Sequence, residues 1–207
     1  MGEGFLVGRP RRQEQRRSEL VAAARRAMLE HGPDSVKLNQ VADAAGLTSG
    51  AVLYYYPDLQ ELLLEANHAG MERFYDERVR MLDTLDGPVE KLVALIRSGL
   101  PVDSEDVDVR LFCELGGSAG RHRVYATLLT GLYDRQVGMY QVLLEQGAAS
   151  GVFTLAQKSI VIARNLVALE DAYGYRIIAK HPVIHAEAAA ELILAYARLA
   201  TGHELLP

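Results

Sequence analysis

Few residues of this 207-residue chain combine the types and spacing that chemistry requires. His181 and His185 are four apart, a spacing that lets two imidazoles on one helix face bind a metal, but Pro182 favours an extended backbone at His181. Cys113 is the only cysteine, which excludes a disulfide within the chain and favours buried packing over a redox role. Because no nucleophile motif or phosphate-binding glycine loop occurs, we expect no enzyme, no metal site and no cofactor.

Two adjacent carboxylates occupy positions where apolar side chains are expected. Glu170 and Asp171 interrupt an apolar stripe in a segment that we expect to be helical and covered by protein on two sides. An unpaired buried carboxylate costs several kcal/mol, so this position needs a partner. The sequence favours an ion pair, with Arg164 or Arg176 across a dimer interface as candidates, and leaves a cationic ligand as the alternative.

The most informative pattern consists of two very short helical segments, residues 38–45 and 48–55, separated only by Gly46 and Leu47. Helices of this length are unstable alone and must brace each other across the turn. Gly46 provides the positive φ that ends the first segment, and Ala42 is small enough for the segments to approach closely. This pattern is typical of a helix-turn-helix, whose second helix lies in the DNA major groove. The side chains that it presents there are Thr48, Ser49, Ala51, Tyr54 and Tyr55.

The elements that carry these residues are predicted to be helical throughout, because alternating strand patterns and hairpin turns are nearly absent. We expect an all-α fold with a basic arm at residues 1–17, a helix-turn-helix domain at 18–57 and a larger helical domain at 58–207. Ser18 is the predicted cap of the first helix. Residues 58–85 form a helix that bridges the two domains, and residues 116–120 form a flexible glycine-rich link.

Composition and charge agree with this division. Apolar residues make up 49% and charged residues 24% of the chain, as in soluble globular proteins. No stretch approaches the roughly 20 apolar residues of a membrane span, and no signal-peptide core is present, so we expect a cytoplasmic protein. The net charge of −5 conceals an asymmetry, since residues 1–56 carry +2 and residues 57–207 carry −7. Five arginines within residues 9–17 form either a solvated arm or a phosphate-contacting arm.

The stretch from Ser18 to Leu63 resembles the DNA-binding domain of the TetR family of bacterial transcriptional regulators. The resemblance rests on His31-Gly32, on Val36, on the run from Val41 to Val52, and on Leu62-Leu63. It implies a dimeric regulator, a repressor that a small-molecule ligand releases from a palindromic operator, with the ligand site and the dimer contacts of the last two helices in the larger domain. The chain departs from the family pattern at three positions, namely Lys37, Leu53 and Leu59.

The predicted sites follow from the motif and from this resemblance. The candidate DNA-binding residues are Arg11, Arg12, Lys37, Asn39, Gln40, Thr48, Ser49, Ala51, Tyr54, Tyr55 and Tyr56. The candidate ligand-binding residues are Phe74, Met81, Phe112, Tyr125, Tyr133, Tyr140, Asn165, Glu170 and Tyr173, with ordinary helix packing as the alternative for each. The competing function is an all-helical small-molecule binding or interaction protein whose DNA-binding helix has lost its role, as the departures at Leu53 and Leu59 suggest.

Overall fold

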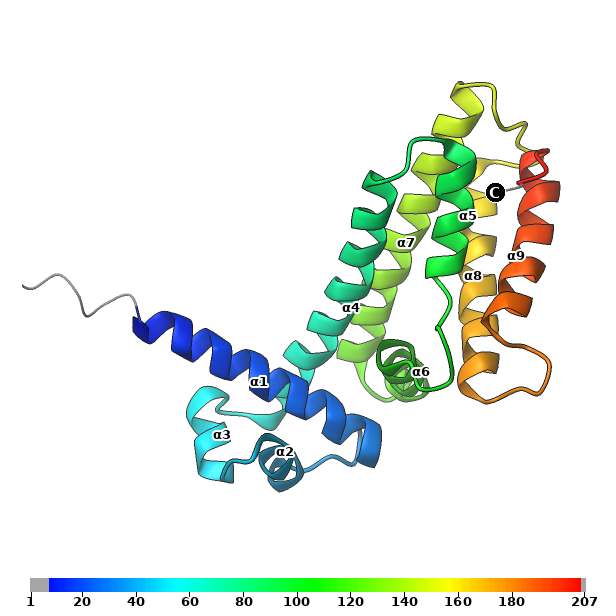
Figure 1. The fold of residues 1–207 in the computed structure, drawn as a ribbon. Helices are drawn as coiled ribbons and strands as arrows, with labels where there is room; N and C mark the ends of the chain where they lie inside the picture. The colour runs from blue at the N-terminus through cyan, green and yellow to red at the C-terminus, as the bar shows by residue number, and fades with distance from the viewer. Residues whose placement is uncertain (1–7, 206–207) are drawn as a thin grey trace, which may run out of the picture. The chain divides into compact units, whose positions relative to one another are not determined.

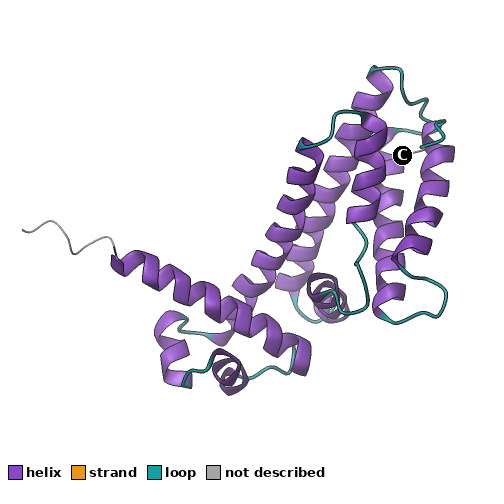
Figure 2. Ribbon diagram, in the orientation of Figure 1, coloured by secondary structure: helices purple, strands orange, loops and turns teal. Residues whose placement is uncertain are grey.

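The computed structural model describes the backbone of residues 8–205 and the side chains of residues 12–205. Every regular element in this range is an α-helix (Figure 2), which confirms the predicted all-α fold. None of the helices within the range is long and apolar enough to cross a membrane. The chain divides into two compact units between Met71 and Glu72, inside a continuous helix.

The first unit contains three helices and the beginning of a fourth (Figure 1): α1 (Gly8–His31), α2 (Leu38–Ala45), α3 (Ser49–Tyr55) and α4 (Leu59–Asp83). Helix α1 packs against α2, and α2 packs against α3. Apolar side chains from all four helices fill the space between them and exclude water, which stabilises helices too short to persist alone. The fully buried members of this core include Leu20, Ala24, Met28, Val41, Val52 and Leu62.

Helix α1 begins earlier than the sequence predicted. The prediction that Ser18 caps this helix was wrong, because the helix already runs from Gly8 through the arginine-rich segment. Acidic partners offset the like charges that favoured an unstructured arm: Arg16 lies 2.7 Å from Glu19 and Arg17 lies 2.6 Å from Glu65. The part of the predicted arm at residues 1–7 lies outside the described residues.

The second unit contains the rest of α4 and five further helices: α5 (Pro88–Ser98), α6 (Val107–Ala119), α7 (Arg123–Ala149), α8 (Ser159–Ile178) and α9 (Ala186–Thr201). Helix α7 packs against α5, α6 and α8, while α9 packs against α8 and α5. Two faces of α8 are therefore covered, as its two apolar stripes predicted. Ile162 and Leu166 of one stripe and Ala163 and Val167 of the other are all fully buried.

Helix α6 differs from its prediction in extent. Its N-terminus is capped by Asp106, because Asp106 Oδ1 accepts hydrogen bonds from the backbone N–H groups of Asp108 and Val109 at 3.1 Å. Its C-terminus continues through Gly116 and Gly117, which the sequence placed in a flexible link. Leu115 and Ser118 are buried, so packing on this helix outweighs the low helix propensity of its glycines.

Candidate functional site

The turn between α2 and α3 has the geometry that its glycine predicted. Gly46 adopts φ 66° and ψ 34°, the left-handed conformation that ends α2. The backbone N–H groups of Gly46 and Leu47 close the turn on the Asp43 and Ala42 carbonyls at 3.1 and 2.9 Å. Thr48 begins α3, and its Oγ1 accepts a hydrogen bond from Ala51 N at 3.2 Å. These bonds fix the direction of α3 relative to α2.

One face of α3 is buried and the other is open. Val52 is fully buried and fastens the helix to the core of the first unit, whereas Tyr54 is 73% exposed and Leu53 is 41% exposed. The rings of Tyr54 and Tyr55 meet edge to face with centroids 5.0 Å apart, which orients the exposed tyrosine. The open face thus carries an aromatic ring with a hydroxyl group.

Tyr56 does not belong to the DNA-binding surface for which the sequence predicted it. Its side chain is fully buried, so it contributes to the core of the first unit and not to the surface of α3. The sequence had placed Tyr55 and Tyr56 together at the DNA-binding surface, but only Tyr55 is partly accessible. The error arises because three consecutive tyrosines at the end of a short helix leave the register of the buried ring ambiguous.

Most of the other predicted DNA-binding residues lie at the surface of the first unit. Lys37, Asn39 and Thr48 are exposed, whereas Gln40, Ser49 and Ala51 are partly exposed. Gln40 has a structural role as well, because its Oε1 accepts a hydrogen bond from Lys37 N at 2.7 Å and completes the start of α2.

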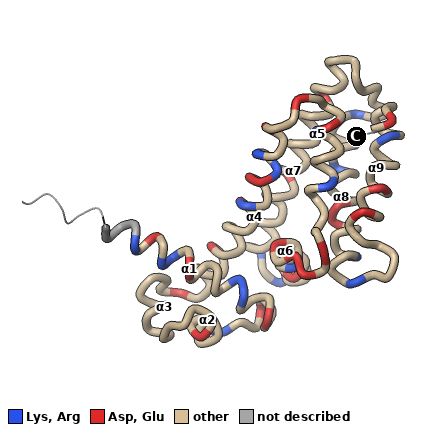
Figure 3. The backbone as a smooth tube through the Cα atoms, in the orientation of Figure 1, with Lys and Arg blue, Asp and Glu red and all other residues tan. Residues whose placement is uncertain are grey.

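The arginines of α1 fall into two groups. Arg12 is exposed, and the side chain of Arg11 lies outside the described part of the chain. Arg17 is committed to the fold, because it donates hydrogen bonds to Tyr55 O at 3.0 Å and to Glu65 at 2.6 Å and stacks over the Tyr56 ring. Figure 3 shows acidic positions interspersed with the basic ones along α1, so its surface is mixed rather than uniformly basic.

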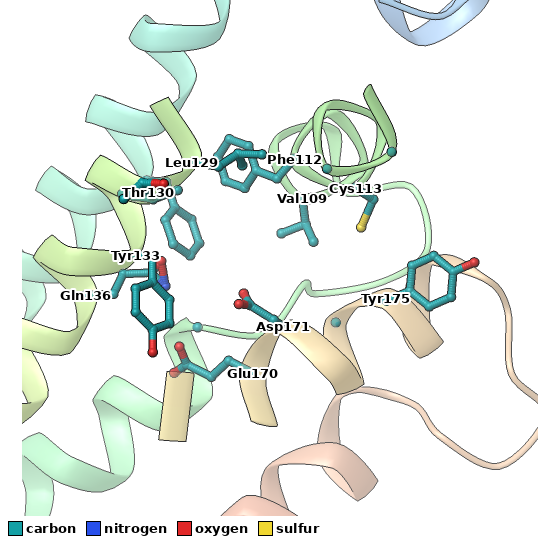
Figure 4. A pocket seen from close by; sticks show the side chains of 16 residues that line it. Val109, Phe112, Cys113, Leu129, Thr130, Tyr133, Gln136, Glu170, Asp171 and Tyr175 are labelled. Atoms are coloured by element: carbon teal, nitrogen blue, oxygen red, sulfur yellow. The ribbon is translucent and has the colours of Figure 1, made fainter. Parts of the chain in front are cut away.

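The second unit encloses a cavity of about 640 Å³ among α4, α6, α7 and α8 (Figure 4). This volume falls within the range of small-molecule sites. Four of the nine predicted ligand-binding residues line it, namely Phe74, Phe112, Tyr133 and Glu170. The rings of Phe74 and Phe112 meet edge to face at 5.6 Å. Lining residues that the sequence prediction missed include Val109, Cys113, Leu129, Thr130, Gln136 and Asp171.

The remaining five predicted residues lie outside the cavity wall and have other environments. Tyr125 is buried against the His122 ring, and Tyr140 is fully buried behind the wall. Asn165 donates a hydrogen bond to the Tyr196 hydroxyl at 2.8 Å. Met81 and Tyr173 are partly buried. The sequence located the correct helices but not the side of each helix that faces the cavity.

Glu170 has an ion-pair partner, although not one that the sequence named. Arg78 Nη2 of α4 lies 2.9 Å from Glu170 Oε1, and both side chains are 1% exposed. Arg78 Nη2 also donates to Leu95 O at 2.9 Å, and the Tyr140 hydroxyl donates to the same Glu170 oxygen. The assignment to Arg164 or Arg176 was therefore wrong, because the pairing residue lies within the chain, 92 positions away.

The cluster of Glu170, Arg78 and Tyr140 is buried, and this burial shifts the pKa of Glu170. Desolvation raises the pKa of Glu170 above its ordinary value, and the charge of Arg78 opposes that rise. Gly99 packs directly against the Glu170 carboxylate, so closely that a Cβ atom at this position would overlap it. The absence of a side chain at Gly99 is therefore what allows a carboxylate to occupy this place in the wall.

Asp171 differs from its neighbour, because it makes no hydrogen bond or ion pair with any residue that the structure describes. Its side chain is accessible, and Figure 4 shows the carboxylate directed into the space among the lining side chains. Desolvation by the surrounding protein raises its pKa to about 6, although Arg78 acts in the opposite direction. The wall thus carries one carboxylate without a counter-charge in contact.

His181, His185 and Cys113 lie in environments that favour structural roles over metal binding or redox chemistry. His181 Nδ1 accepts from the backbone N–H groups of Val183 and Ile184, and His185 caps α9 by accepting from Ala188 N. Within the described residues no three His, Cys, Asp or Glu side chains group as a metal site. Burial raises the pKa of the Cys113 thiol, which disfavours the reactive thiolate.

The geometry defines a class of protein, one with a helix-turn-helix unit and a second helical unit that contains a cavity. Residues 20–66 match the family described as bacterial regulatory proteins, tetR family. The HTH-type transcriptional regulator BetI of Agrobacterium fabrum is 32% identical over 88 residues, which are 42% of this chain and 43% of BetI. The chain therefore aligns with less than half the length of this curated relative.

Solved structures resemble nearly the whole chain in fold. A transcriptional regulator from Saccharomonospora viridis, solved in complex with choline, has a TM-score of 0.81 and 21% identity, covering 89% of this chain and 96% of its own. A TetR transcription regulator from Haloarcula marismortui has a TM-score of 0.81 and 24% identity, covering 91% and 99%. Residues 20–66 thus match the DNA-binding region of the TetR family, as the motif predicted.

Proposed function

We propose that this protein is a dimeric transcriptional regulator that binds operator DNA through α3 and releases it when a small molecule occupies the cavity. The observation that carries the proposal is the α2–α3 pair. Its turn at Gly46 is fixed by backbone hydrogen bonds, and its second helix exposes Thr48 and Tyr54 while Val52 holds it to the core. This is the arrangement in which a helix enters the major groove. Such a protein acts in the cytoplasm, where the DNA is.

Dimer formation is proposed for the outer face of α8 and α9. Val161 on α8 is 40% exposed, and Leu192 and Leu199 on α9 are 45% and 80% exposed. Apolar side chains at helical spacing on neighbouring helices suit an interface with a second copy of the same face. A twofold dimer presents two copies of α3 and therefore binds an inverted-repeat operator. The variant Leu199→Glu is expected to yield monomers in light scattering and to weaken operator binding.

Ligand control is proposed to act through α4. Leu62 and Leu63 of this helix lie in the core of the first unit, whereas Phe74 lines the cavity of the second. A ligand that favours one position of α4 changes the DNA affinity, typically by about 1–3 kcal/mol of coupling. The complex of the Saccharomonospora viridis regulator with choline supports a small-molecule occupant for this fold. Repression relieved by the ligand is the proposed direction.

Selection from random duplex DNA at low salt tests the proposal. We expect enrichment of an inverted repeat, and a loss of at least about tenfold in affinity for Tyr54→Ala, the size of a lost base or phosphate contact. Tyr54→Phe is the matched control, because it keeps the ring and removes only the hydroxyl, which separates stacking from hydrogen bonding. Weak retention without sequence preference would instead support a small-molecule binding protein whose α3 no longer recognises DNA.

A further inference from the structure

The wall of the cavity carries an imbalance of charge. Two of its lining residues, Glu170 and Asp171, are acidic, and none of those that the structure describes is Lys, Arg or His. The charge of Glu170 is compensated by Arg78 behind the wall, at 2.9 Å. That of Asp171 is not compensated by any hydrogen bond or ion pair within the described residues. The wall therefore carries one uncompensated negative charge, and this charge faces the cavity.

We infer that the cavity takes an organic cation, with its positive group beside Asp171 and its apolar body against the rings of Phe74 and Phe112. This inference rests on the proposed function, since it names the class of effector that the regulator senses. A cation next to Asp171 supplies the partner that this partly desolvated carboxylate otherwise lacks. An anion there would meet the same charge with no basic side chain on the wall to offset it.

A second atom in the same wall points to the same class of ligand. Glu170 Oε1 accepts from both Arg78 and Tyr140, but Glu170 Oε2 is buried and has no hydrogen-bond partner among the described residues. A buried carboxylate oxygen without a donor is costly. An ammonium group with N–H donors, bound between the two adjacent carboxylates, would satisfy it. This feature is independent of the accessible Asp171 carboxylate.

The rest of the wall suits an apolar body. Phe74, Phe112 and Tyr133 present aromatic surface, and Val109 and Leu129 add aliphatic surface. Aromatic faces attract cations through their quadrupole, with about 0.5–2 kcal/mol per contact. The volume of about 640 Å³ accommodates a ligand well beyond the size of a simple ammonium ion. The ligand class is thus a protonated amine with a substantial hydrocarbon part.

The ionisation of Asp171 supports this chemistry. Desolvation by the wall raises the pKa of Asp171 to about 6 and so disfavours the charged carboxylate, whereas a bound cation favours it. Binding of a protonated amine is therefore expected to strengthen between pH 5 and pH 8 and to release a proton at the lower end. The other titratable groups on the wall are Glu170 of α8, paired with Arg78 of α4, together with Cys113 of α6, Tyr133 of α7 and Tyr175 of α8.

The test uses three probes with the same heptyl chain and different head groups: heptylammonium, N,N-dimethyloctanamide and octanoate. Calorimetric titration into the full-length protein at pH 8 is expected to show the cation binding at least about tenfold more tightly than the amide, with octanoate weakest. Asp171→Asn is expected to remove most of this preference and to leave amide binding unchanged. Asp134→Asn is the matched control, since Asp134 is exposed, unpaired among the described residues and outside the wall.

Two results would overturn the inference. One is tighter binding of the amide or octanoate than of the cation, or no cation binding at millimolar concentration. The other is an unchanged preference for the cation in Asp171→Asn, provided that its circular dichroism melt shows a folded protein. The proposed function fails separately, if no operator is selected from random DNA. An operator released by a neutral effector would leave the proposed function standing and exclude the cation.

Discussion

Arg78 of α4 and Glu170 of α8 form an ion pair that is removed from water, with Arg78 Nη2 2.9 Å from Glu170 Oε1. Phe74 lies one helical turn before Arg78 and lines the cavity together with Glu170. The Arg78 guanidinium also lies over the Phe74 ring, 5.3 Å from its centroid. The pair therefore joins the helix that enters the second unit to the wall of the cavity.

The first prediction concerns this pair. Arg78→Met is expected to lower the free energy of unfolding by about 3–5 kcal/mol, because Glu170 keeps a buried charge without its counter-ion. The double variant Arg78→Met with Glu170→Gln is expected to recover part of that loss, since no net charge is then buried. Urea-induced unfolding measures both. Arg80→Met, at an exposed position of the same helix, is the control and should change stability by less than about 0.5 kcal/mol.

The second prediction is a pH dependence. The pKa of Asp171 is raised from 3.8 to about 6 in the folded protein, so between these values the folded state binds more protons than the unfolded state. The contribution of Asp171 to stability is therefore greatest below pH 4 and is lost as the pH rises through 6. Asp171→Asn is expected to melt at a higher temperature than the parent protein at pH 8, with the difference shrinking toward pH 4. An equal difference at both pH values would contradict the assignment.

The fold was largely predictable because its signals are local. Glycine and proline mark the ends of most helices, and α2 was predicted at its observed bounds, residues 38–45. The errors at α1 and α6 have a common cause. Repulsion among the arginines at residues 9–17 disfavours a helix there, and the low helix propensity of Gly116 and Gly117 disfavours one at α6. Glu65 for α1 and the buried side chains of α6 nevertheless stabilise these helices through tertiary contacts.

The cavity was less predictable than the helix-turn-helix. Apolar periodicity identified α7 and α8 and the aromatic Tyr133, yet it does not separate a ring that lines a cavity from one that fills a core, such as Tyr140. The partner of Glu170 lies 92 residues away, so no spacing rule reveals it. What the sequence did show was the anomaly itself, two carboxylates in an apolar stripe, and one of the two, Asp171, lacks a contact partner among the described residues.

The third prediction tests the turn of the helix-turn-helix. Gly46 adopts a φ of 66°, and a Cβ there would meet no atom within 4 Å, so any cost of a side chain is a cost of backbone conformation. Gly46→Ala is expected to destabilise the first unit by about 1–2 kcal/mol, and Gly46→Asn by less. Gly50→Ala is the matched comparison, since Gly50 is helical and equally uncrowded. For Gly50→Ala, thermal unfolding should show a free energy of unfolding about 0.5–1 kcal/mol higher than that of the parent protein. Similar effects at both glycines would contradict the positive φ as the reason for glycine at position 46.

The fourth prediction concerns phosphate contacts. Lys37 is exposed immediately before α2 and is one of the predicted DNA-binding residues of the first unit. Each phosphate neutralised by a basic side chain releases a counter-ion, so the logarithm of the affinity falls with the logarithm of salt concentration. Lys37→Ala is expected to weaken binding to operator and non-operator DNA alike and to reduce the magnitude of that slope by about one.

Lys158→Ala is the control for this measurement, because Lys158 is exposed at the start of α8 in the second unit. It changes the net charge of the protein by the same amount, so a general electrostatic effect would move both slopes equally. A slope altered only by Lys37→Ala places a phosphate at the N-terminus of α2. A slope altered by neither variant would mean that Lys37 points away from the DNA, and the phosphate contacts would then have to come from Arg12 and its neighbours on α1.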